Sequence, residues 1–221
     1  MGRSREYEGD GIAVSFEAER CIHAAECVGG LPAVFNPDSR PWISPDGASP
    51  EDVARVVSRC PTGALSFERR DGGPAEAPPP SNSLRVGADG PVFATGRLVI
   101  LDAERRELCR ETRVALCRCG ASGNKPYCDG AHKAAGFRDP GTVETAHVKP
   151  AEREGGPDLT IRLRADGPLV LEGPFALSGS DGSAVRGAAA ALCRCGASRN
   201  KPFCDGSHRH IDFSPDDPSA G

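Results

Sequence analysis

The chain has 221 residues, a net charge of -4, 27 glycines and 20 prolines, while Leu, Ile, Val and Phe make up only about a fifth of it. So little apolar material argues against one large enzyme domain and favours small modules that are stabilised by metals, disulfides or partners. No apolar stretch approaches the roughly 20 residues of a membrane span, and the charged N-terminal segment does not resemble a secretory signal. We therefore expect a cytoplasmic protein without membrane or nucleic-acid partners, whose clustered cysteines are metal ligands or redox groups rather than structural disulfides, while Cys109, outside the clusters, is a packed cysteine.

The first third of the chain predicts a compact α+β unit over residues 6–68. Residues 11–16 alternate like a strand, and residues 22–27 and 50–59 have helical patterns. Residues 64–67 are expected to form a closing strand. We interpret this unit as a small ferredoxin-like domain, for the reasons given below with its cysteines.

An internal repeat follows a Pro-rich linker over residues 69–83. The sequence Ala-Asp-Gly-Pro at 88–91 recurs at 165–168, and residues 115–130 recur at 191–206. Duplicated modules often bury their faces against one another, so we expect the two copies to pack together.

Each copy predicts a β-rich module, one over residues 84–138 and one over residues 159–213, with a second linker over 139–158. The strand-like runs are 84–86, 91–101 and 114–119 in the first copy and 159–163, 168–177 and 190–195 in the second. A short helix capped by Asp129 or Asp205 is expected after the third run.

Both copies carry three cysteines and one histidine at the same spacing. These candidate metal ligands are Cys117, Cys119, Cys128 and His132 in the first copy and Cys193, Cys195, Cys204 and His208 in the second. In a strand, Cys-x-Cys presents two thiolates on one face, and a Cys and His four residues apart converge from one helical turn. An odd number of thiols per copy disfavours internal disulfides. From the residues alone, such a set could hold tetrahedral zinc as well as an iron-sulfur cluster.

The two stretches resemble the CDGSH iron-sulfur family of mitoNEET-like proteins. The family pattern Cys-x-Cys-x2-Ser/Thr-x3-Pro-x-Cys-Asp-Gly-Ser/Ala/Thr-His is met in full at 117–132 and again at 193–208. The resemblance implies one [2Fe-2S] cluster per motif, held by the three Cys and the His. It also implies a monomer in which the modules form an intramolecular pseudo-dimer, because family members with a single motif pair as homodimers.

Residues beside the ligands have two interpretations. Arg118, Asn124 and Lys125 either surround the cluster or are solvated loop charges, and the same holds for their counterparts in the second copy. Gly120 and Gly196 are expected to let the backbone approach a cluster closely.

Three further cysteines, Cys21, Cys27 and Cys60, lie in the N-terminal unit, the last of them followed by proline. They resemble the divergent mono-cluster ferredoxin domain, in which Cys-x2-Cys-x2-Cys is joined by a distant Cys-Pro. Ala24 stands where the usual middle ligand would be, so three thiolates favour a [3Fe-4S] cluster. His23 is a candidate additional ligand that would instead complete a [4Fe-4S] cluster.

Neither a catalytic constellation nor a phosphate loop nor a dinucleotide fingerprint is present in the sequence, so we expect no enzyme activity. The favoured function is electron transfer by a carrier of three clusters that serves an unidentified redox partner protein. A cluster transfer protein or a redox or pH sensor is the alternative that uses the same residues. A zinc-stabilised interaction module is the third.

Overall fold

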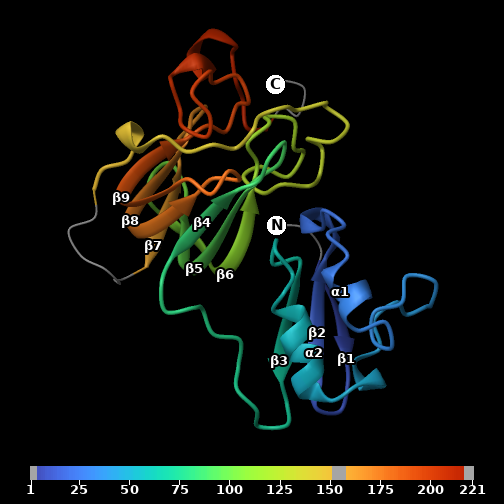
Figure 1. Cartoon of the computed structure of the whole chain (residues 1–221). Helices are drawn as coiled ribbons and strands as arrows, with labels where there is room; N and C mark the ends of the chain where they lie inside the picture. The colour runs from blue at the N-terminus through green and yellow to red at the C-terminus, as the bar shows by residue number, and fades with distance from the viewer. Residues whose placement is uncertain (1–3, 151–157, 217–221) are drawn as a thin grey trace. The chain divides into compact units, whose positions relative to one another are not determined.

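The computed structural model describes residues 4–150 and 158–216 of the chain, which divides into two compact units, Met1–Ala77 and Pro78–Gly221 (Figure 1). Each unit has a hydrophobic core of its own. Within the described residues, no helix is both long enough and apolar enough to cross a membrane.

The N-terminal unit is an antiparallel three-stranded sheet covered by short helices. The strands, in sheet order, are β1 (Ser4–Glu8), β2 (Ile12–Glu17) and β3 (Leu65–Arg69). The helices are α1 (Glu26–Gly30) and α2 (Pro50–Val57), with 3-10 turns η1 (Ala18–Arg20) and η2 (Pro45–Gly47). The sequence predicted β2, α2 and β3, and it missed β1.

Helix α2 begins at a serine cap and buries one face. Ser49 Oγ accepts a hydrogen bond from the Asp52 N–H at 3.2 Å, and Val53, Val56 and Val57 pack into the core. The helix predicted over residues 22–27 is wrong, because α1 begins only at Glu26. His23 and Ala25 adopt left-handed backbone conformations, with φ of 56° and 61°, which a right-handed helix cannot include.

The C-terminal unit contains one six-stranded sheet. Its strands are β4 (Ser83–Val86), β5 (Val92–Leu101), β6 (Glu107–Leu116), β7 (Leu159–Leu163), β8 (Leu169–Ser178) and β9 (Ala184–Leu192). The first two predicted strands of each copy are found. The third was wrong in extent, because β6 and β9 start well before the predicted runs and end before the cysteines.

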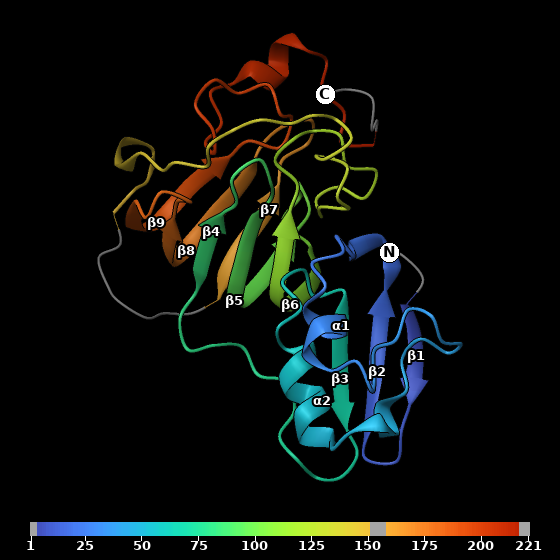
Figure 2. The same ribbon diagram turned by 45° about the vertical axis from the view of Figure 1, so that its right-hand side comes forward.

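The two repeats share this sheet by exchanging their short strands. β4 pairs antiparallel with the first half of β5 and parallel with the end of β8. β7 does the converse, pairing antiparallel with the first half of β8 and parallel with the end of β5. The β5–β6 and β8–β9 hairpins are thereby joined through both short strands, as Figures 1 and 2 show.

A single buried side chain ties the two hairpins where the exchange takes place. The ladders of β5 and β8 are interrupted between Thr95 and Leu98 and between Glu172 and Phe175. Asn82 lies between them: its Oδ1 accepts from the N–H of Arg97 at 2.9 Å, and its Nδ2 donates to the carbonyl of Pro174 at 3.0 Å. The loops that follow β6 and β9, which carry the cysteine motifs, lie at the same end of the sheet (Figure 2).

Candidate metal centres

The first cysteine motif begins where β6 ends and folds back beside it. The N–H of Cys117 donates to the carbonyl of Pro126, and the N–H of Cys128 donates to that of Ala115, both at 2.8 Å. The expectation that Cys-x-Cys lies in a strand is therefore wrong, because Cys117 already bonds to the returning loop instead of to β5. The second motif repeats this pattern, with Cys193 bonded to Pro202 at 2.8 Å and Cys204 to Ala191 at 2.9 Å.

The four candidate ligands of each motif fall into two close pairs. In the first motif the two sulfur atoms of Cys117 and Cys119 are 3.7 Å apart, and Cys128 Sγ lies 3.4 Å from His132 Nδ1. The second motif matches it, with 3.8 Å between the sulfurs of Cys193 and Cys195 and 3.4 Å between Cys204 Sγ and His208 Nδ1.

These spacings suit two metal atoms per motif. Two ligands of one tetrahedral metal, bonded at about 2.3 Å for sulfur and 2.0–2.1 Å for nitrogen, lie about 3.5–3.8 Å apart. Each observed pair falls at or close to this range, so each pair can chelate one metal atom. The pairing of the donors is therefore compatible with two metal atoms in each motif.

Hydrogen bonds within the motif hold the loop in shape without a helix. Ser122 Oγ donates to the carbonyl of Tyr127 at 2.7 Å and accepts from the Asn124 N–H at 3.1 Å. Asp129 accepts from the N–H groups of Gly123 and Ala131 at 2.8 and 2.9 Å. The helix expected after Asp129 is a series of turns, because the carboxylate closes a local turn here instead of capping a helix. In the second motif the corresponding segment is one 3-10 turn, η4 (Ser207–His210).

Arg118 is fully buried and anchors the motif to the loop between β4 and β5. Its guanidinium donates to the carbonyls of Gly90 at 2.9 Å and Gly87 at 2.7 Å, and it pairs with the carboxylate of Asp139. The solvated-charge interpretation is therefore wrong for this residue. Lys125 Nζ likewise donates to the carbonyl of Ser122, at 2.8 Å.

The two motif loops touch each other through a pair of glycines. Gly120 and Gly196 have φ of 83° and 82°, a region that favours glycine. A Cβ on Gly120 would lie 2.3 Å from the carbonyl oxygen of Cys195, and one on Gly196 would lie 2.2 Å from that of Cys119. The close approach expected of these glycines is therefore between the two loops, next to a ligand of each motif.

The thiols of one motif differ in protonation. The hydrogen bond between the sulfurs of Cys117 and Cys119 lowers the pKa of Cys117 to about 6 and raises that of Cys119. Burial, followed by the Cys117 charge, raises the pKa of Cys128 to about 12, and burial lowers the pKa of His132. At neutral pH the metal-free motif therefore holds one thiolate, two protonated thiols and a neutral imidazole.

The N-terminal cysteines line a cavity of about 430 Å³. Cys21 follows η1, Cys27 lies in the first turn of α1 and Cys60 follows α2. His23 and Ala24 also line the cavity, and its apolar walls include Phe16, Trp42 and Leu65. The structure thus brings together all three predicted cysteines and the candidate additional ligand.

Burial raises the pKa of both Cys21 and Cys27, and the other cavity thiols raise them further. Backbone N–H groups oppose this: that of His23 lowers the pKa of Cys21, and that of Val28 lowers the pKa of Cys27. Such donors favour the thiolate and so favour metal binding.

Two residues that support the N-terminal site were missed from the sequence. Arg20 is buried, and its Nη2 donates to the carbonyl of Thr62 at 2.9 Å. The hydroxyl of Thr62 lies 3.6 Å from the sulfur of Cys60. The signal for Thr62 was its place two residues after Cys60, whereas Arg20 looked like any surface arginine.

Comparison with known families agrees with these sites. A model described as a divergent 4Fe-4S mono-cluster matches residues 7–70, and one described as an iron-binding zinc finger of CDGSH type matches residues 89–133 and 166–209. The chain thus carries two CDGSH-type domains behind a divergent mono-cluster domain. Both resemblances seen in the sequence are confirmed.

Curated relatives match the N-terminal unit. The uncharacterized protein YjdI of Escherichia coli strain K12 is 38% identical over 69 residues, which are 31% of this chain and 91% of the relative. The YjdI protein of Escherichia coli O157:H7 gives the same values. No solved structure matches the chain.

Proposed function

We propose that this CDGSH protein is an electron carrier with three iron-sulfur clusters, two of the [2Fe-2S] type and one in the N-terminal unit. The observation that carries the proposal is the arrangement of ligands in close pairs, which suits two irons in each CDGSH motif. Such a cluster, when bound, accepts and returns single electrons.

The residues of each motif provide a prearranged and partly dry site. Cys117 and Cys119 would hold one iron, and Cys128 and His132 the other, with Cys193, Cys195, Cys204 and His208 in the same roles. Because the loop is fixed by its own hydrogen bonds, little reorganisation of the ligands is needed when charge changes. A carrier benefits from this, since electron exchange is then limited by contact with its partner.

For the N-terminal unit we propose a [4Fe-4S] cluster held by Cys21, Cys27, Cys60 and His23. Two observations support four irons over the three favoured by the cysteine count: His23 lines the same cavity as the cysteines, and the matching family is described by a 4Fe-4S cluster. The positive φ of His23 is a conformation that the surrounding structure must enforce, as often happens at binding sites.

We further propose that the two repeats act as an intramolecular pseudo-dimer in a monomeric, cytoplasmic chain that docks a redox partner protein. The exchanged strands and the contact between Gly120 and Gly196 support this pairing.

The test is the iron and sulfide content of anaerobically purified protein, with electron paramagnetic resonance and a reductive titration. About eight irons with matching sulfide are expected, or about seven if the N-terminal cluster has three irons. All clusters are expected to be reduced and reoxidised without loss of absorbance. Stoichiometric zinc without sulfide would refute the cluster proposal, and clusters that are lost on a single reduction would refute the carrier proposal.

A further inference from the structure

The two CDGSH motifs share their ligands but differ in what lies over them. In the first repeat the chain turns back over the loop between β4 and β5: the N–H of Asp139 donates to Asp89 Oδ1 at 2.7 Å, and the Asp89 N–H donates to the carbonyl of Asp139 at 2.8 Å. The Asp139 carboxylate pairs with the buried Arg118, and Gly141 is buried against Gly87. We call residues 138–141 the cover segment.

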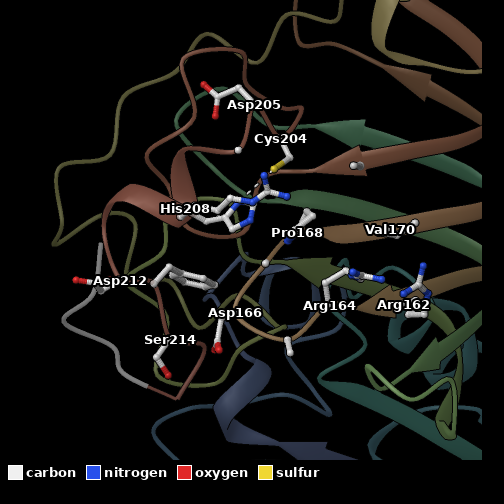
Figure 3. A pocket seen from close by; sticks show the side chains of 16 residues that line it. Arg162, Arg164, Asp166, Pro168, Val170, Cys204, Asp205, His208, Asp212 and Ser214 are labelled. Atoms are coloured by element: carbon white, nitrogen blue, oxygen red, sulfur yellow. Dashed lines mark hydrogen bonds between the residues drawn. The ribbon is translucent and has the colours of Figure 1, made fainter.

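The second repeat has a cavity in the corresponding place. It measures about 960 Å³ and is lined by the loop between β7 and β8, by Arg162 and Arg164, and by the ligands Cys204 and His208. Figure 3 shows His208 and Cys204 next to each other, with Arg162 and Arg164 on one side of the cavity and Asp212 on the other.

Three substitutions between the repeats account for this difference. Pro215 stands at the position of Asp139, so it supplies no carboxylate, and Arg194, the counterpart of Arg118, forms no ion pair within the described residues. Arg164 replaces Gly87, and a long side chain lines the space where the cover segment crosses in the first repeat. Ser214 replaces Arg138, whose guanidinium lies 3.7 Å from the Asp89 carboxylate.

The Cys–His pair under the cover segment is less exposed to solvent than the Cys–His pair that lines the cavity. Cys128 is 2% exposed and His132 is 8% exposed. Cys204 and His208 are half-buried. The Cys-x-Cys pairs differ in the opposite sense, because Cys119 is half-buried whereas Cys117, Cys193 and Cys195 are buried.

We propose that the two motifs have different roles: the cover segment closes the Cys128–His132 pair of the first, and the cavity makes Cys204 and His208 the exchange face of the molecule. This inference rests on the proposed function, since it names the site at which a partner meets the carrier.

The first arm of the test uses metal-free protein and iodoacetamide, with mass spectrometry to follow each cysteine. Cys204 is expected to be alkylated several-fold faster than Cys128. Asp139→Ala, which removes the pair with Arg118, should raise the Cys128 rate several-fold and leave the Cys204 rate unchanged. Asp89→Ala, which keeps that pair and removes the acceptor for the Asp139 N–H, should act in the same direction.

A matched control is Asp102→Ala, an equally small change at the opposite end of the β5–β6 hairpin, where the side chain of Asp102, among the residues that the structure describes, bonds within its own turn. It should leave both alkylation rates unchanged. Equal rates for Cys128 and Cys204 in the parent protein, or a faster Cys128, would overturn the proposal.

The second arm uses the loaded protein at fixed pH with excess EDTA, followed by visible absorbance. Two phases are expected, and His208→Cys should remove the fast phase while His132→Cys should leave it in place. Loss of the fast phase in His132→Cys would overturn the assignment. A preparation without iron and sulfide would refute the proposed function instead, and the alkylation arm would still report on the cover segment.

Discussion

The cysteines of the CDGSH motifs owe their protonation to one another as much as to burial. The sulfurs of Cys117 and Cys119, and those of Cys193 and Cys195, hydrogen-bond to each other, so that each pair shares one proton and the pKa of Cys117 and of Cys193 is lowered. Because a metal binds the thiolate and not the thiol, one cysteine of each motif is ready at neutral pH, as is the neutral histidine, and two cysteines must lose protons.

This sharing predicts an unusual titration of the metal-free protein, seen as thiolate absorbance in the ultraviolet. As pH rises through about 6, absorbance should increase by one thiolate per motif, since the pKa of Cys117 and of Cys193 is lowered to about 6. The double variant Cys117→Ser and Cys193→Ser should lose this step. Cys109→Ser, outside both motifs, should retain it, and a single rise near pH 8.5 in the parent would contradict the shared proton.

Gly120 offers a second test at this scale. Gly120→Ala should destabilise the protein by well over the about 1–2 kcal/mol that a left-handed conformation costs an L residue, because its Cβ would meet the backbone of Cys195. Gly182 has φ of 85° and open space around it, so Gly182→Ala isolates the conformational cost. Urea unfolding measures the free energy of unfolding of both variants. Equal decreases in the two variants would show that the motif loops do not need this contact.

At the scale of elements, sequence patterns located most strands and the ligands but not the shape of the motifs. Strands β5 and β8 were visible because their buried positions are apolar, whereas the first half of β6 was missed because it is polar and pairs with β5 alone. The spacing of the ligands along the chain also predicted that each Cys-x-Cys and each Cys–His set forms a close pair. The backbone that aligns them depends on bonds such as Cys117 to Pro126, which join residues by loop closure and leave no periodic signal.

A prediction at this scale concerns Asn82, whose side chain joins the two hairpins. Asn82→Ala removes the bonds to the N–H of Arg97 and to the carbonyl of Pro174, both in half-buried surroundings, at a cost of about 0.5–1.5 kcal/mol for each. Asn82→Asp keeps the acceptor for the N–H of Arg97 and should therefore lower the free energy of unfolding by less. Urea unfolding of the C-terminal unit measures both, and an Ala variant as stable as the parent would show that the hairpins are joined by the strand ladders alone.

At the scale of the whole molecule, the two units have separate cores, and the YjdI relatives correspond to the first unit almost alone. We therefore predict that residues 1–77 and residues 78–221, expressed separately, each bind their own clusters. About half of the iron should be found with each fragment, because one [4Fe-4S] cluster holds as many irons as two [2Fe-2S] clusters. A fragment that folds but binds iron only when the other is added would contradict this independence.

The sequence difference between the repeats also could not be interpreted without the fold. Asp139 lay in a predicted linker, and only the crossing of the loop between β4 and β5 shows that it pairs with Arg118. A pattern search for ligands treats the two motifs as equal, because their ligands are the same.

The exchanged strands have a consequence for how the chain is made. When a ribosome has produced the first repeat, the far half of β5 is paired with β6 on one edge, but its other edge and one edge of β4 lack a partner strand, because β7 and β8 are not yet synthesised. Unpaired edges of this kind attract other nascent chains. The order of synthesis thus leaves a waiting period in which two copies of the first repeat can pair with each other, and the short distance along the chain to the second repeat keeps that period brief.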